Sequence, residues 1–229
     1  MKRSRTVALI SVFAALNVIC DSIVGLPQDI VWYGWIFVIE PLNGIILGPW
    51  GGFLSTLIGV MVGHSVYFRG EFEYIFSIGA PLGATISGLV YHRRLKLVFA
   101  YFAALLTAYF LTSVAWSLPF WGMWDTLLAF AVLCATIIFS KKLSSMRQEL
   151  YVMLIAAFVG LEADILFRIF ILVPCQTYQL FFTAETLQAI WSVAAFITPI
   201  QAAVSMVVTA LIGPRALQLI RHNVEPEEV

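Results

Sequence analysis

Few residues of this chain can do chemistry, and three of them fall within one short apolar run. The run is Gly160-Leu-Glu-Ala-Asp-Ile-Leu-Phe-Arg168, which carries Glu162, Asp164 and Arg168. Residues four apart share a helix face, so Asp164 and Arg168 can form an ion pair. Glu162 lies about 200° around the helix from Asp164 and faces a different neighbour. The run predicts either an ion pair and a protonated Glu162 that hold helices together, or a site where Arg168 or Glu162 contacts a polar ligand.

Other polar side chains interrupt apolar stretches of the sequence at Asp21, Glu40, His64 and Asp125. An ionisable group in the hydrocarbon core costs about 2.5–3.5 kcal/mol on insertion scales, so each invites a functional hypothesis. Glu40 begins the run Glu40-Pro-Leu-Asn43-Gly44, where the proline frees backbone carbonyls beside two polar side chains. Locking of helices explains Glu40 equally well. His64 fits a packed or interfacial histidine better than a ligand, and Asp21 and Asp125 lie near span ends.

Aromatic residues gather immediately before Asp125. The segment Trp116-Ser-Leu-Pro-Phe-Trp121-Gly-Met-Trp124-Asp125 places three indole rings beside a carboxylate. Aromatic faces next to a carboxylate can stack a heterocycle or hold a cation. A belt of tryptophans at the membrane interface is the more ordinary explanation of the same residues.

These residues together form the predicted substrate-binding set. Five carboxylates against one arginine in the apolar segments favour a solute with a cationic or amine-bearing part, although a coupling cation fits them equally well. The sequence contains no P-loop, H-E-x-x-H, G-x-S-x-G or dinucleotide motif, so it predicts neither catalysis nor a cofactor or metal. The predicted set is Glu40, Asn43, His64, Trp124, Asp125, Glu162, Asp164 and Arg168.

The composition indicates what kind of scaffold must position these residues. The chain has 229 residues, of which 61% are hydrophobic and 11% charged. Its mean hydropathy is +0.94. An ordinary soluble domain carries about 25% charged residues, so a soluble enzyme is excluded. The basic residues are spread along the chain and lend no support to nucleic-acid binding. A polytopic all-α membrane protein is the prediction.

A helix needs roughly 17–25 apolar residues to cross the bilayer core. The stretches left between such segments are too short for a soluble domain, so residues 1–229 form a single integral membrane domain. Helices satisfy their own backbone groups in lipid, which excludes an open sheet. The predicted bundle has about eight spans, at residues 6–25, 31–47, 50–68, 74–91, 97–116, 121–139, 150–173 and 188–212.

The distribution of basic residues predicts the orientation. If the N-terminus is cytoplasmic, inner segments hold eleven of the thirteen Lys and Arg residues, Arg69 lies in an outer loop and Arg168 in a span. Both termini are then cytoplasmic, and the protein is a multi-pass protein of the cell membrane. Most of the polar candidates fall in the outer half of their spans. We therefore expect a polar cavity that opens outward, because a channel carries polar groups along its whole length.

The first 95 residues carry a resemblance to a known family. The stretch Pro41-Leu-Asn-Gly-Ile-Ile-Leu-Gly-Pro-Trp-Gly-Gly52, the first helix Thr6-Val-Ala-Leu-Ile-Ser-Val-Phe-Ala-Ala-Leu-Asn17, and Ser77-Ile-Gly-Ala-Pro-Leu-Gly-Ala84 resemble energy-coupling-factor (ECF) transporter S components. These membrane proteins capture vitamins or similar micronutrients for import. The resemblance implies a transmembrane coupling subunit and ATPase subunits as partners. It also implies docking through small residues of the first helix, here Ala8, Ser11 and Ala15.

The family is normally built from six helices, so residues 97–229 have no assigned counterpart in it. The first functional hypothesis is accordingly a substrate-binding membrane subunit for micronutrient uptake. A self-sufficient secondary transporter of a small solute or ion is the alternative, and it predicts inverted repeats around a midplane site. A membrane-embedded enzyme is the third reading, and it needs convergent acid and base groups.

Overall fold

The computed structural model describes residues 3–23, 32, 34–71, 73–139, 147–181 and 183–224, and within them the chain is helical, with no strand. Lys2, Lys141 and Lys142, which were used to predict the orientation, lie outside the described residues. So do residues 24, 25, 31 and 33 of the predicted spans. The helices are α1 (Arg3–Ser22), α2 (Glu40–Val66), α3 (Glu73–Phe76), α4 (Gly79–Tyr91), α5 (Leu95–Phe110), α6 (Trp124–Phe139), α7 (Arg147–Leu172) and α8 (Ala184–Val224), with short 3-10 helices η1 (Ile36–Val38), η2 (Ser113–Ser117), η3 (Phe120–Met123) and η5 (Thr177–Leu180).

Several of these helices have the length and composition of membrane spans. Within the described part of the chain, six helical stretches qualify, and α5 is apolar but shorter. The all-helical fold class is confirmed, and the helices indicate a multi-pass membrane protein. The count of eight spans stays a prediction. The six stretches are Ser4–Ser22, Glu40–Val66, Glu73–Tyr91, Phe120–Phe139, Glu149–Leu172 and Ala184–Ile220.

The largest difference from the predicted spans lies in α2. The segment 31–47 does not form a full helical span, because regular helix begins only at Glu40 and is preceded by the short η1. The eight helical residues 40–47 extend about 12 Å, far less than a bilayer core of about 30 Å. At Gly48 the backbone leaves helical geometry (φ 77°, ψ 170°), a conformation that favours glycine. Pro49 then begins the second half of α2.

The two halves of α2 form a tight helical hairpin that packs on α4. A β-carbon at position 52 would lie 2.7 Å from the Cα of Gly44, and one at position 88 would lie 2.7 Å from the Gly44 carbonyl oxygen. Backbones approach this closely only where side chains are absent. The glycines of Asn43-Gly44 and of Gly51-Gly52 therefore bring residues 40–47 between the second half of α2 and α4.

Other boundaries differ in smaller ways. The predicted span 97–116 is helical in α5 only to Phe110, and the chain then turns through η2. The predicted span 188–212 is part of α8, which has 41 residues and contains Pro199 and Pro214. Hydropathy marks the apolar part of a helix, whereas hydrogen bonding continues into its polar ends. For this reason α8 extends beyond both ends of the predicted span.

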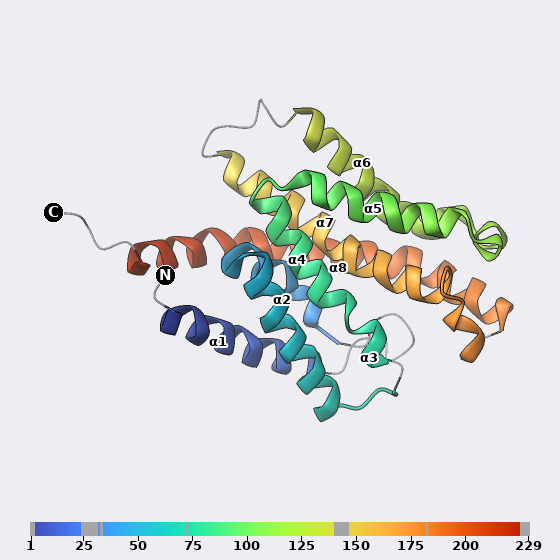
Figure 1. The fold of residues 1–229 in the computed structure, drawn as a ribbon, viewed down its shortest axis with the longest axis horizontal. Helices are drawn as coiled ribbons and strands as arrows, with labels where there is room; N and C mark the ends of the chain where they lie inside the picture. The colour runs from blue at the N-terminus through green and yellow to red at the C-terminus, as the bar shows by residue number, and fades with distance from the viewer. Residues whose placement is uncertain are drawn as a thin grey trace.

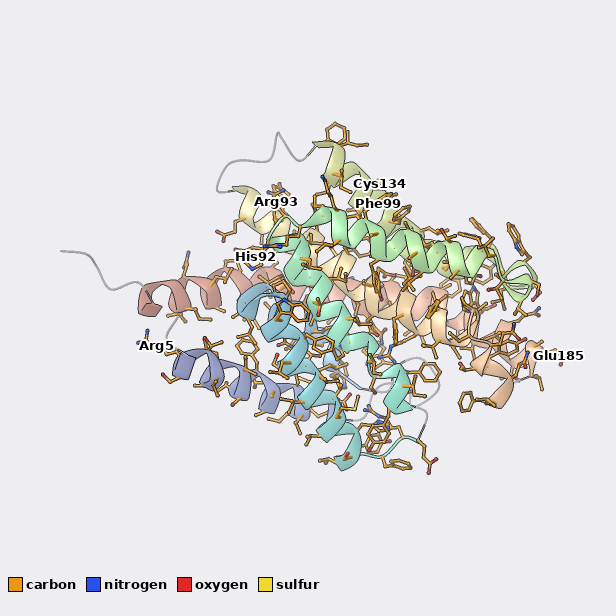
Figure 2. The ribbon with its side chains drawn as sticks, in the orientation of Figure 1. Arg5, His92, Arg93, Phe99, Cys134 and Glu185 are labelled. Carbon is orange, nitrogen blue, oxygen red and sulfur yellow. The ribbon has the colours of Figure 1, made fainter. Side chains whose placement is uncertain are left out.

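The elements run between two ends of an elongated bundle (Figure 1). Both chain termini lie at one end, and α3 lies toward the other. Figure 2 shows Arg5, His92 and Arg93 on the side of the termini and Glu185 at the far end. The main apolar core joins α4, α5, α6 and α7, where Phe102, Leu133 and Met153 are fully buried.

Candidate functional site

A partly enclosed cavity of about 150 Å³ lies between α7 and α8. The second half of α7 and the first half of α8 form its long walls, with η1, the first turn of α6, Arg69 and Glu73 around them. Three carboxylate side chains and two guanidinium groups line it, together with apolar residues such as Phe37, Leu161 and Ile165. The lining thus combines an apolar surface with one more carboxylate than guanidinium.

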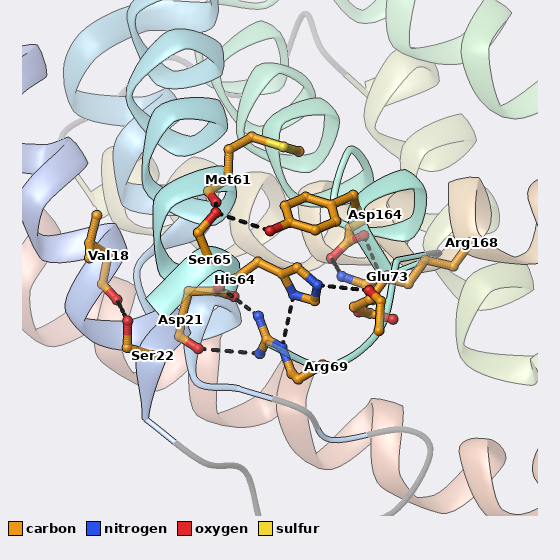
Figure 3. A network of polar contacts seen from close by, with 12 residues as sticks. Val18, Asp21, Ser22, Met61, His64, Ser65, Arg69, Glu73, Asp164 and Arg168 are labelled. Atoms are coloured by element: carbon orange, nitrogen blue, oxygen red, sulfur yellow. Dashed lines mark hydrogen bonds and ion pairs between the residues drawn. The ribbon is translucent and has the colours of Figure 1, made fainter. Parts of the chain in front are cut away.

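Arg168 is the centre of one charged cluster. Its Nε donates to Asp164 Oδ1 at 2.8 Å, one turn earlier on α7, and its Nη1 lies 3.3 Å from Glu73 Oε1 on α3. Figure 3 shows the three side chains meeting from two elements. Asp164 is almost fully buried, whereas the Arg168 side chain keeps 29% of its surface exposed. Both carboxylates contact one guanidinium, so the cluster links α3 to α7 across this wall.

A second ion pair, between Arg69 and Asp21, lies beside the Arg168 cluster. Arg69 Nη2 donates to Asp21 Oδ2 at 2.6 Å, and both side chains are 5% exposed. Arg69 Nε also donates to His64 Nδ1 at 3.2 Å. Because a guanidinium is always a donor, His64 accepts at Nδ1, and its Nε2–H donates to the Gly70 carbonyl at 3.0 Å. His64 therefore positions Arg69 and the turn that follows it, as Figure 3 shows.

The opposite part of the cavity contains carboxylates without a cationic partner. Asp125, at the start of α6, accepts hydrogen bonds from the Thr198 hydroxyl and from the Thr126 backbone N–H. The Thr126 hydroxyl donates to Glu162 Oε2 at 2.9 Å. Glu162 is fully buried, and its other oxygen makes no hydrogen bond with the described residues. Two threonines thus link a pair of carboxyl groups from α6 and α7 to α8.

Glycines make room for the polar side chains of the site. A β-carbon at position 79 of α4 would overlap Asp164 Oδ1, and one at position 122 would overlap the indole edge of Trp191. A β-carbon at position 34 would lie 2.9 Å from Arg69 Nη1. Because glycine has no side chain, the polar groups can pack directly against backbone at these three positions. The close fit indicates a built site, since each glycine leaves space for one lining residue.

The chemistry that this arrangement permits is recognition of a small solute. The cavity offers carboxylate acceptors, a guanidinium edge, an indole N–H and an apolar surface. An enclosed apolar cavity of about this volume admits a benzene-sized molecule. Within the part of the chain that the structure covers, no group of three or more His, Cys, Asp or Glu side chains is arranged to hold a metal ion.

Known proteins supply no relative for comparison. No family model, curated protein or solved structure matches this chain. The resemblance of residues 1–95 to ECF transporter S components therefore stays a hypothesis. The functional argument rests on the site itself.

Three of the predicted site residues line the cavity: Asp125, Asp164 and Arg168. The predicted pairing of Asp164 with Arg168 is confirmed. Glu162 faces a different neighbour from Asp164, as its helical position predicts, and contacts Thr126 of α6 directly behind the lining. Two separated runs of the sequence, around Asp125 and Glu162, therefore meet at one site.

The other predicted site residues lie outside the lining. Glu40 is fully buried against Gly83 of α4, and neither of its oxygens has a hydrogen-bond partner among the described residues. Asn43 donates to Asn17 at 2.8 Å and to Thr56 at 2.7 Å, so it ties α1 to the α2 hairpin. Trp124 donates to the Ala195 carbonyl at 2.9 Å and is 46% exposed, as an interfacial residue would be. His64 acts through Arg69.

The predicted docking residues occupy one exposed face of α1. Ala8, Ser11 and Ala15 are all exposed, with the Ser11 hydroxyl bonded to its own helix at the Val7 carbonyl. Nothing in the described residues covers them. The face is compatible with lipid or with a partner helix.

Several cavity residues were not predicted from the sequence. Arg69 was assigned to an outer loop and Glu73 falls between two predicted spans, although their side chains contact α1 and α7. Trp191, Thr198 and Gln201 form one stripe of α8 at helical spacing, and all three are buried. Thr198 before Pro199 and the isolated amide of Gln201 are polar interruptions of an apolar run. That signal was present in the sequence.

Proposed function

We propose that this chain is the substrate-binding membrane subunit of a micronutrient uptake transporter and captures a small solute in the cavity between α7 and α8. The observation that carries the proposal is the cavity itself. It combines ion-paired walls, the buried carboxylate of Asp125 without a cationic partner among the described residues, and an apolar lining. Few precisely placed polar groups in a mostly apolar pocket are typical of small-molecule sites.

The predicted orientation and partners support the same proposal. The cavity lies among the helix ends away from the termini, and the basic-residue bias assigns that end to the outside. The chain carries no nucleotide-binding motif, and in the proposed assembly ATPase subunits supply the energy for import. The exposed small residues of α1 offer a face for a transmembrane coupling subunit.

Ligand-dependent stability of the purified protein tests the proposal. A ligand at 100 times its dissociation constant adds about 2.7 kcal/mol to the apparent free energy of unfolding. We expect at least one compound in a panel of vitamins, nucleobases and amino acids to raise the melting temperature. Ala194 lines the cavity from α8, and Ala194→Leu should abolish that rise because the larger side chain fills the site.

The matched control is Ala203→Leu, the same substitution at an exposed position of the same helix. It should leave ligand stabilisation intact. Stabilisation that survives Ala194→Leu would place the ligand elsewhere, and failure of every compound with the folded protein would remove the support for solute capture.

The break in α2 favours a second candidate, a self-sufficient secondary transporter. Such transporters bind coupling ions at interrupted helices near the bilayer midplane. Gly48 interrupts α2, and the buried Glu40 has no hydrogen-bond partner within the described chain. Solute uptake by liposomes that contain only this chain, without ATP, would favour the carrier over the subunit.

A further inference from the structure

Asp125 differs from the other cavity carboxylates in what neutralises it. Asp164 and Glu73 each contact the Arg168 guanidinium. Asp125 is only 2% exposed, yet its described partners are the Thr198 hydroxyl and the Thr126 N–H, which carry no charge. A buried carboxylate without a cation is costly. A positively charged ligand group at this wall would remove that cost.

Trp191 supplies a second, independent feature of the same wall. Its ring stacks on Tyr109 at 5.8 Å with an interplanar angle of 4°, so the indole is held in one orientation. The residue is 4% exposed and lines the cavity, but its Nε1–H has no acceptor among the described residues. This Nε1 packs against Gly122, which also lines the cavity, so a ligand acceptor would meet it at the junction of these two residues.

The guanidinium groups already contact carboxylates, whereas Asp125 has no cationic partner among the described residues. Arg168 already contacts two carboxylates, and Arg69 contacts Asp21 and His64. An anionic ligand group would have to displace an internal partner. The free recognition capacity therefore lies on the side of Asp125 and Trp191, where it calls for a positive charge and a hydrogen-bond acceptor.

We propose that the solute is a small organic cation whose protonated nitrogen pairs with Asp125 and whose acceptor atom receives the Trp191 N–H, with an apolar body against Leu161 and Ile165. This inference rests on the proposed function and names the class of its substrate. A volume of about 150 Å³ suits a ligand built on one ring. The bare charge of an inorganic ion would leave the apolar lining and the indole N–H unused.

A series of probes of equal size tests the charge. The probes are benzylamine, benzyl alcohol and benzoate, and their binding to the detergent-purified full chain is measured by ligand-observed NMR titration. We expect benzylamine to bind at least about tenfold more tightly than the alcohol, the difference typical of a hydrogen bond to a charged group. Benzoate should bind more weakly still. Equal binding of the three probes to the wild-type protein would overturn the proposal without any variant.

Two substitutions locate the contacts. Asp125→Asn should reduce benzylamine binding to that of benzyl alcohol, whereas Glu185→Gln, at an exposed site in the first turn of α8, removes one charge elsewhere and should not. Aminomethylpyridine isomers add an acceptor to benzylamine. At least one isomer should bind more tightly than benzylamine and lose that gain in Trp191→Phe. Circular dichroism and elution volume confirm that each variant is folded.

The outcomes separate this inference from the proposed function. A neutral or anionic solute that stabilises the protein, and is blocked by Ala194→Leu, would leave capture standing and overturn the cationic class. Benzylamine binding that sodium or potassium ions abolish would assign Asp125 to an inorganic cation and overturn it too. If no probe and no solute binds a folded protein, both proposals fail.

Discussion

At the scale of single residues, the ion pair of Asp21 and Arg69 joins two distant parts of the chain and is almost fully buried. The two residues are 48 positions apart, and both side chains are 95% buried from solvent by the fold. The pair joins the end of α1 to the turn after α2. A buried pair is weak evidence of net stabilisation, but removing one partner leaves an uncompensated charge in low dielectric.

We therefore expect Arg69→Ala to lower the free energy of unfolding by about 3–5 kcal/mol. The double substitution Asp21→Asn with Arg69→Ala should recover most of that loss, because no orphaned charge remains. Unfolding by denaturant titration in detergent measures both. Arg94→Ala, at an exposed position, serves as control. Equal loss in the single and double variants would mean that Arg69 acts by packing and not by charge.

The two ion pairs show what sequence can predict at this scale. Asp164 and Arg168 lie four apart on one helix, so their contact follows from helix geometry. Nothing local relates Asp21 to Arg69, and Glu73 reaches Arg168 across 95 positions. Such contacts depend on which helices are neighbours. Glu40 was rightly expected to be buried, but only the fold places it against Gly83 instead of in the cavity.

At the scale of elements, the crossing of α4 and α7 determines the shape of the site. Gly79 and Gly83, one turn apart on α4, provide the space for Asp164 and Glu40. Gly160 of α7 provides the space for Ser87 in the same way. Small residues on both helices let three polar side chains lie against backbone. The segment Ser77 to Ala84, noted for its family resemblance, thus has a packing role in this chain.

Gly79→Ala is expected to displace Asp164 and to cost about 1–3 kcal/mol of stability through overpacking. Because Asp164 would shift from Arg168, the cavity should also lose affinity for its ligand. Gly213→Ala is the control, since its added carbon would approach no atom more closely than the flexible end of Met153, at 3.2 Å. The melting temperatures of Gly79→Ala and Gly213→Ala are compared, and the former should be the lower. Similar values would show that the α4–α7 crossing adjusts without strain.

At the scale of the whole molecule, the basic residues near the termini and the acidic Glu185 lie at opposite ends. Both termini lie on the side of Arg5, His92 and Arg93, and Glu185 lies at the other end (Figure 2). The cavity lies among the helix ends on the side of Glu185. This arrangement agrees with an even number of passages and with basic residues facing the cytoplasm.

Cysteine labelling of intact cells checks the orientation. In a variant whose Cys20, Cys134 and Cys175 are replaced by serine, Glu185→Cys should react with a membrane-impermeant maleimide. Arg94→Cys should react only after the cells are permeabilised. Both native positions are exposed, so accessibility differs only by side. The reverse labelling pattern would mean that the orientation is inverted and that the cavity opens to the cytoplasm.

Composition together with the length of the apolar runs predicts the helical membrane class, because helices satisfy their own backbone groups in lipid and the runs are too long for barrel strands. The cavity could not be predicted, because it depends on α8 lying against α7. The stripe of Trp191, Thr198 and Gln201 looks like any half-polar helix face until its neighbour is known. The break at Gly48 was marked by the adjacent proline. The length of regular helix before it was overestimated, since the apolar residues 34–39 form only the short η1 and the chain beside it.

The short half-helix of residues 40–47 has a consequence for biosynthesis. It is too short to be recognised by the insertion machinery as a span, and it begins with a carboxyl group that lipid disfavours. The half-helix packs at Glu40 against Gly83, which in turn packs against Gly160, and both glycines are translated later. The nascent chain therefore has to hold this segment at the mouth of the translocon, or paired with residues 49–66, until α7 emerges. Assembly of this membrane protein is ordered by a segment that cannot enter the bilayer on its own.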